Sequence, residues 1–122
     1  MAAQQKVEKL ALSGSTNGKR IKVAATATPG TLIHTATASA TDTFDEVWLN
    51  VYNSDTAPVE ITFEWGEATA PDGNVKQTIP AKSGLTQVIP GDVLQNSLVV
   101  RAFAGTTNVL TVGGYVHRLS PT

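Results

Sequence analysis

Short segments in which apolar and polar residues alternate recur about every 8–12 residues along this chain of 122 residues, separated by Gly, Pro, Asn, Asp or Ser. Alternation with a period of two places successive side chains on opposite faces of a β-strand, and this spacing of strands is typical of a β-sandwich or barrel. The pattern therefore predicts an all-β fold, an antiparallel β-sandwich of about eight strands, jelly-roll-like or immunoglobulin-like. The predicted strands are Arg20–Ala25, Thr31–Thr37, Phe44–Asn53, Val59–Trp65, Val75–Ile79, Leu85–Ile89, Leu98–Ala104 and Val109–Leu119.

The composition agrees with one domain built from packed sheets. Apolar residues make up 41% of the chain and charged residues only 16%, and there is no Cys. A chain of this length is long enough to bury one substantial core. Without Cys, the fold has neither disulfides nor thiolate metal sites, so packing and hydrogen bonds must hold it together.

The N-terminal segment differs in character from the rest. Residues 1–22 carry five basic residues and one acid, whereas the remaining residues carry four basic residues and nine acids. We expect residues 1–19 to form an arm with a flexible joint at 13–18, and residues 20–122 to form the sandwich domain. Residues 3–12 fit either a short amphipathic helix or an extended arm, and the basic charge fits either docking on an acidic neighbour or a solvated tail.

Two strands predict the core and its first pairing. Val47, Leu49 and Val51 share one face of the strand over 44–53, and every second residue from Val59 to Trp65 does the same in the next strand. We expect these strands to form a hairpin across Asn53–Pro58, with Glu60, Thr62 and Glu64 on an outward, solvated face. In the last strand, the pair Gly113-Gly114 predicts either a bulge or a close approach of backbone.

Some strands are apolar on both faces. Trp48 and Tyr52 lie on the face opposite Val47 in the third predicted strand, and Val99 and Phe103 lie on the second face of the seventh. A strand buried on both faces needs a third layer. A long loop, the N-terminal arm and another protein chain are the three layers that fit.

No grouping of side chains predicts an active site. The segment 14–19 resembles a phosphate-binding loop only in outline, because three residues rather than four separate its glycines and Arg20 replaces the Ser or Thr that would meet magnesium. The chain also has no G-x-S-x-G nucleophile elbow. We therefore expect no enzyme activity and no catalytic residue.

The residues best able to hold a metal ion are the two histidines, His34 and His117, and the acids Asp42, Asp45 and Glu46. Nothing in the spacing brings a carboxylate beside either histidine, and the acids lack the loop pattern of a calcium site. We interpret His34 as a surface or hydrogen-bonded strand residue and the acids as groups that keep a sheet edge soluble. The sequence predicts no metal and no cofactor.

Several classes of partner are also disfavoured. The only basic region carries no aromatic residue, which argues against nucleic acid. No apolar stretch approaches the roughly 18 residues of a membrane helix, and the N-terminal residues lack the pattern of a secretion signal, so we expect neither a membrane partner nor classical secretion. Trp48, Tyr52 and Tyr115 fit either a glycan-stacking platform or aromatic residues packed in a core or an interface, and we favour the second.

Residues 44–119 resemble small virion structural proteins of tailed bacteriophages. The resemblance is carried by FDEVWLNVYNSDTAPVEITFEWG, by IPAKSGLTQVIPG and by LVVRAFAGTTNVLTVGGYVHRL, a pattern of strands and turns without a catalytic signature. It implies a capsid decoration (cement) or fibre-like protein that binds the head lattice, often as an oligomer. The implied partners are the major capsid protein or other virion proteins and further copies of the chain, for example in a trimer.

The expected function is therefore that of a non-enzymatic virion protein, on a phage head or tail, assembled in the host cytoplasm. It would bind the lattice through an apolar sheet face and the N-terminal arm. The alternative is a glycan- or receptor-binding adhesion module of a tail or fibre. Charge and strand alternation supply the expected interface residues, which are Lys6, Lys9, Lys19, Arg20, Trp48, Tyr52, Val99, Phe103 and Tyr115.

Overall fold

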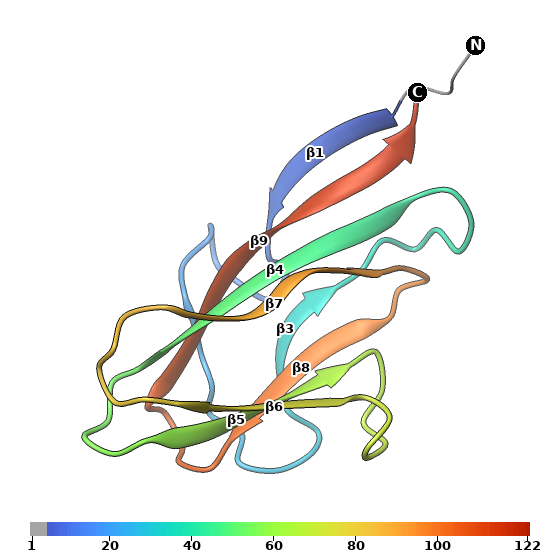
Figure 1. Ribbon diagram of the computed structural model, residues 1–122. Coiled ribbons are helices and arrows are strands. Elements are labelled where there is room, and N and C mark those ends of the chain that lie inside the picture. Colours follow the sequence, from blue (N-terminus) through green and yellow to red (C-terminus); the bar gives the residue numbers. More distant parts are fainter. Residues whose placement is uncertain (1–4) are drawn as a thin grey trace.

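The computed structural model describes residues 5–122, which form nine β-strands and no helix (Figure 1). This confirms the all-β class. The strands are β1 (Gln5–Ala11), β2 (Ile21–Lys22), β3 (Thr31–Thr35), β4 (Phe44–Asn53), β5 (Val59–Trp65), β6 (Asn74–Ile79), β7 (Thr86–Leu94), β8 (Val99–Ala104) and β9 (Leu110–Pro121).

The strands form two antiparallel sheets that pack as a sandwich. Sheet A has the order β1-β9-β4-β7, with β2 also paired to β9, and sheet B has the order β3-β8-β5-β6. The pairs β2 with β9, β3 with β8, β4 with β7 and β5 with β6 are those of one long hairpin rolled up on itself. This is the strand pairing of a jelly roll.

The core lies between the sheets and consists mainly of branched aliphatic residues. The alternation predicted for β4 is confirmed, because Val47, Leu49 and Val51 are buried and the residues between them are not. Ile61 and Phe63 face them from β5 and are also buried. With no disulfide available, this packing is the main source of stability.

The connection over residues 53–58 is not a hairpin turn, so that prediction is wrong. β4 pairs with β7 and β9 in sheet A, whereas β5 pairs with β6 and β8 in sheet B. The connection instead crosses from one sheet to the other. Asn53 holds it in place, because its side-chain Nδ2 donates hydrogen bonds of 2.9 Å to the carbonyl oxygens of Ala57 and Ile79.

The prediction of an outward, solvated row on β5 is also wrong for two of its three residues. Glu60 is exposed, but Thr62 and Glu64 are each only 2% exposed. The segment before β3 folds over this end of sheet B, and Glu64 accepts hydrogen bonds of 2.6 Å from the backbone N–H of Gly30 and the hydroxyl of Thr28. A carboxylate that accepts such bonds is stable away from water.

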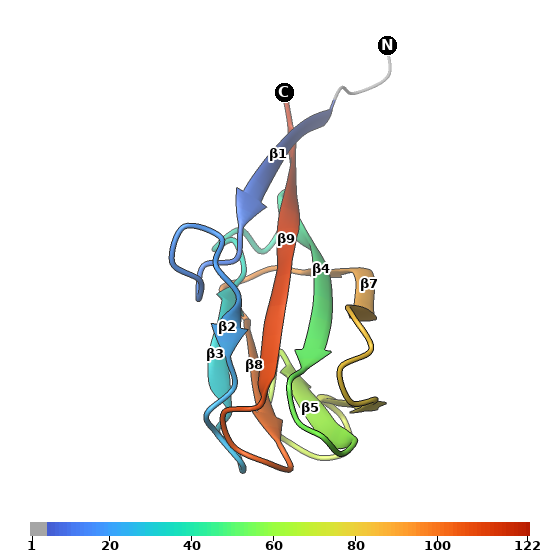
Figure 2. The same cartoon turned by 90° about the vertical axis from the view of Figure 1, so that its left-hand side faces the viewer.

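The N-terminal segment is extended where it is described. Residues 5–11 form the edge strand β1 of sheet A, whereas residues 1–4 of the predicted arm lie outside the described residues. The turn that follows is tied to sheet B, since the N–H of Gly14 donates a 2.9 Å hydrogen bond to the carbonyl of Ile33. Figures 1 and 2 show β1 running along the C-terminal half of β9, at one end of the sandwich.

The pair Gly113-Gly114 marks a close approach of backbone. The register between β4 and β9 runs without a shift through this point, so there is no bulge between these two strands. Gly114 has a φ of 144°, and a Cβ on it would collide with the carbonyl oxygen of Trp48. Only glycine lets β9 lie this close to β4.

Candidate functional site

The outer face of sheet A carries most of the residues expected at an interface. Side chains alternate along each strand, so on β4 the residues facing outward include Trp48 and Tyr52, and on β9 they include Tyr115. Trp48 and Tyr115 are direct cross-strand partners. We call this surface the sheet A outer face.

The aromatic residues there form a cluster with a fixed geometry. The rings of Trp48 and Tyr115 are stacked, with centroids 6.1 Å apart and an interplanar angle of 17°. The ring of His117 lies 5.1 Å from that of Tyr115 and 6.4 Å from that of Trp48. Glu46 Oε1 accepts a 2.9 Å hydrogen bond from Trp48 Nε1 and lies 3.1 Å from His117 Nδ1. These contacts hold the side chains of the cluster in place.

Positive charge flanks the cluster. Lys9 Nζ lies 4.5 Å from the centroid of the Tyr115 ring, a cation–π contact from β1. Arg20 lies against Gly113, where the Cβ of any larger residue would meet its guanidinium. Its guanidinium donates to the side chains of Asn50 at 2.7 Å and Thr111 at 2.9 Å, and partial burial lowers its pKa.

An apolar groove borders the same face. It has a volume of about 380 Å³ and is lined by Phe44, Val93, Leu94, Gln95 and Leu98. Val93, which is 54% exposed, is the cross-strand partner of Glu46, so one wall of the groove lies next to the aromatic cluster.

The structure divides the expected interface residues among different surfaces. Lys9, Arg20, Trp48, Tyr52 and Tyr115 share the sheet A outer face. The other four residues lie elsewhere. Val99 and Phe103 are on the outer face of sheet B, Lys6 is on the opposite side of β1 from Lys9, and Lys19 is exposed in the turn before β2.

The two faces are therefore separate surfaces rather than one apolar layer. Trp48, Tyr52, Val99 and Phe103 are all partly exposed, so none is enclosed within the chain. On sheet B, Phe103 is flanked by Thr62 and by Lys76, whose Nζ lies 5.9 Å from its ring centroid. The sheet A outer face alone brings several aromatic and basic residues together.

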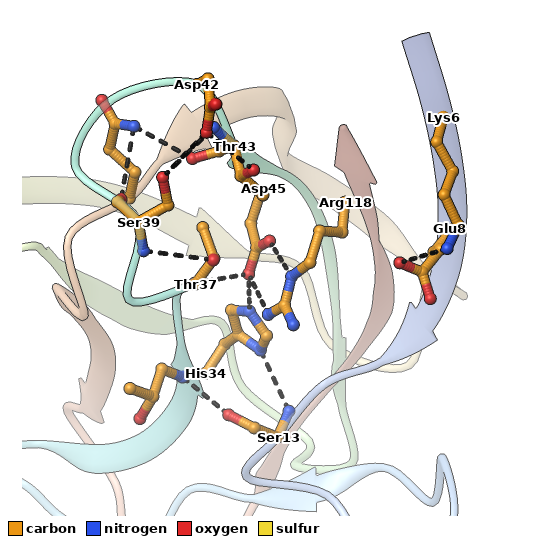
Figure 3. A network of polar contacts seen from close by, with 12 residues as sticks. Lys6, Glu8, Ser13, His34, Thr37, Ser39, Asp42, Thr43, Asp45 and Arg118 are labelled. Carbon is orange, nitrogen blue, oxygen red and sulfur yellow. Dashed lines mark hydrogen bonds and ion pairs between the residues drawn. The ribbon is translucent and has the colours of Figure 1, made fainter. Parts of the chain in front are cut away.

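A buried polar network lies inside the same end of the sandwich (Figure 3). Asp45 is fully buried, and its Oδ2 accepts a 2.7 Å hydrogen bond from His34 Nε2 and a 3.1 Å bond from the N–H of Thr37. Arg118 binds the carboxylate with Nε at 2.7 Å and Nη2 at 3.0 Å. Burial raises the pKa of Asp45, but the hydrogen bonds from Arg118 and His34 outweigh it, so the pKa is lowered overall.

This network corrects the interpretation of Asp45 and confirms that of His34, which is a hydrogen-bonded residue of β3. Asp45 does not keep an edge soluble, and a carboxylate does lie beside each histidine, Asp45 beside His34 and Glu46 beside His117. The signal was available, because Asp45 shares the parity of the buried Val47 on its strand and must face inward.

Ser13, His34 and Asp45 have the composition of a hydrolase triad but not its geometry. The backbone N–H of Ser13, not its hydroxyl, donates to His34 Nδ1 at 3.0 Å. The hydroxyl oxygen instead accepts a 2.7 Å hydrogen bond from the N–H of Thr35. His34 is only 2% exposed and both of its ring nitrogens are engaged, so this arrangement does not activate Ser13 as a nucleophile.

Residues 5–122 contain no group of three or more His, Cys, Asp or Glu side chains placed to hold a metal ion. Within the same range, no helix has the length and apolar character needed to cross a membrane.

Comparison with known proteins adds no relative. A scan against protein-family models finds no match for this chain, and searches of curated proteins and of solved structures find none either.

Proposed function

We propose that this chain is a non-enzymatic virion structural protein, a capsid decoration protein that binds the head lattice through the sheet A outer face. The observation that carries the proposal is the gathering of Lys9, Arg20, Trp48, Tyr52 and Tyr115 on that one face. Aromatic residues and Arg are the types most enriched where proteins bind one another. The resemblance of residues 44–119 to phage virion proteins supports the choice of partner, the major capsid protein or another virion protein.

The state of these side chains also supports a binding role. The contacts of Glu46 with Trp48 and His117 fix the aromatic rings in the free protein, so that little side-chain entropy is lost on binding. The adjoining groove supplies an apolar pocket for an anchoring side chain. The proposal includes assembly of the chain in the host cytoplasm into a homo-oligomer, for example a trimer, that is located on the virion.

Co-sedimentation with capsids of the parent particle, assembled without this protein, tests the proposal. Trp48→Ala and Tyr115→Ala should each weaken binding at least about 30-fold, the effect of losing an interface anchor of about 2 kcal/mol. Phe103→Ala is the matched control, because this aromatic residue is also partly exposed but lies on sheet B, and it should bind like the wild type. Equal binding by all three variants, or no binding by the wild type, would refute the proposal.

A glycan is the second candidate ligand, and one observation favours it. The stacked rings of Trp48 and Tyr115 lie beside hydrogen-bonding groups of Glu46, Asn50 and Arg20. Binding on a glycan array that is lost in Trp48→Ala but kept in Phe103→Ala would select this function over capsid binding. An array without signal would remove it.

A further inference from the structure

β1 is an edge strand with little cover. It is the terminal strand of sheet A in the described chain, and β9 is its only paired neighbour. Six of its seven residues are exposed, and Val7 is 57% exposed. The outer edge of such a strand offers unpaired backbone N–H and C=O groups to another strand.

The usual devices that block an edge are weak in β1. The strand contains no Pro, and its register with β9 is regular over all seven residues, so no bulge turns the edge away. Lys6 and Lys9 are the protective type of residue, but Lys6 forms an ion pair of 3.6 Å with Glu8 on its own strand. The edge is therefore open to a strand with a complementary charge pattern.

We propose that β1 pairs antiparallel with β1 of a second copy of this chain, around a twofold axis at Val7. This register places Lys6 of each copy opposite Glu8 of the other, on one face of the sheet. On the other face, the two exposed Val7 side chains meet. Opposite charges directly across a strand pair stabilise it, and an apolar pair removes exposed surface from water.

The alternative registers are less favourable. In an antiparallel pair, directly opposite residues alternate between hydrogen-bonded and non-hydrogen-bonded pairs. A twofold axis between two residues would make two successive pairs equivalent, which this alternation forbids. The axis must therefore lie between one residue and the same residue of the other copy. An axis at Lys6, Glu8 or Lys9 would place two like charges directly opposite each other. An axis at Leu10 would pair only residues 9–11 of β1, because the chain then turns toward Ile33 of sheet B.

The pairing would join the two copies of sheet A into one continuous sheet. A twofold axis perpendicular to that sheet keeps both sheet A outer faces on the same side. The inference deepens the oligomer part of the proposed function, because a pair of copies would present two binding faces to one surface. A contact made by one strand edge is small beside the roughly 1,000 Å² of a stable interface, so we expect dimers at high concentration, or when both copies sit on one surface.

Cross-linking of the purified protein tests the pairing without any capsid. The chain has no Cys, so Val7→Cys creates a single thiol. Residues directly opposite in an antiparallel pair have Cα atoms about 4.5 or 5.5 Å apart, within the roughly 4.4–6.8 Å that a disulfide spans. In a glutathione buffer, Val7→Cys should form disulfide dimers at least about tenfold faster than Val93→Cys, which is 54% exposed on β7 at the other edge of sheet A. Equal rates would overturn the proposal.

Charge exchange tests the register. With Cys at position 7, Lys6→Glu and Glu8→Lys should each slow homodimer formation at least about fivefold, and a mixture of the two variants should form mainly heterodimers. The mixture controls for damage to β1, since each variant is present in both measurements. Random pairing in the mixture would refute the Val7 register. If the cross-linking fails but the protein still binds capsids, only the β1 pairing is refuted. If cross-linking is normal but the protein does not bind capsids, only the proposed function is refuted.

Discussion

Replacing Asp45 by Asn should destabilise the fold more than any other change of one carboxylate to its amide near this end of the sandwich. The side chain of Asp45 is fully buried and accepts four hydrogen bonds, two of them from Arg118. An Asn keeps one carbonyl oxygen, which can still accept from His34 and Thr37. Its NH₂ group then faces a donor of Arg118, and the ion pair is lost.

The magnitude follows from these contacts. Losing a hydrogen bond between charged groups costs about 1.5–3 kcal/mol, and removing one partner of a buried ion pair costs about 3–5 kcal/mol. The side chain of Arg118 is 31% exposed and recovers part of its hydration, so the lower part of this range applies. We expect a loss of about 3 kcal/mol, or about 10 °C in Tm for a domain of this size.

Urea denaturation followed by tryptophan fluorescence measures this loss, with Asp42→Asn as the control. Asp42 is exposed and makes only long hydrogen bonds of 3.3 and 3.4 Å, so its change should cost less than about 0.5 kcal/mol. Equal stability of the two variants would show that the network around Asp45 contributes nothing.

The pH dependence gives a second check. The pKa of Asp45 is lowered in the folded state from its ordinary value of 3.8, so the unfolded chain binds more protons than the folded chain between the two pKa values. The stability contributed by Asp45 is therefore fully present above the unfolded value and is lost as the pH falls through the folded value. The difference in stability between the wild type and Asp45→Asn should shrink below about pH 4. A difference that stays constant from neutral pH to pH 2.5 would contradict this origin.

Two further predictions concern single residues. Gly114→Ala should destabilise the fold by more than about 2 kcal/mol, because the new Cβ meets the Trp48 carbonyl. Gly84→Ala is the control in the same urea assay and should cost about 1 kcal/mol, because Gly84 has a φ of 78° but nothing within 4 Å. Similar losses in the two variants would contradict the close approach. Glu64→Gln should lower the free energy of unfolding by about 2 kcal/mol, because it weakens two hydrogen bonds of 2.6 Å. Glu60→Gln changes a side chain that is 53% exposed and should cost less than about 0.5 kcal/mol. Thermal denaturation measures both variants, and equal Tm values would contradict the role of Glu64.

Local alternation predicts the strands and their faces well, because it depends only on neighbouring residues. It correctly places Val47 inside and Trp48 outside, and the eight predicted strands correspond to β2 through β9. It does not predict which strands pair. β4 binds β9, which begins more than fifty residues after β4 ends, and nothing near 53–58 distinguishes a hairpin from a connection between sheets.

The errors at polar residues have a different cause. Alternation places Glu64 on the face of β5 that points away from the core, but it does not show that another segment covers this face. The interpretation of Asp45 as an edge residue overlooks that Asp45 shares the inward face of Val47. The partners of these two acids, Arg118 and the segment around Gly30, are distant in the sequence, so the hydrogen bonds that make burial tolerable cannot be foreseen locally. The sequence likewise leaves residues 3–12 open between a helix and an extended arm, because the pairing of β1 with β9 joins the two ends of the described chain.

The buried network and the sheet A outer face are coupled through strand register. Asp45 pairs with Arg118 across β4 and β9, and the next residues on each strand, Glu46 and His117, pair on the outer face. A slip of one residue would turn Asp45 and Val47 outward and break the contacts of Asp45 with His34 and Arg118. The ion pair inside therefore selects the register that brings Trp48 beside Tyr115 outside. The network would thereby support the proposed binding without touching the partner, because it holds the aromatic cluster in the arrangement that the outer face presents.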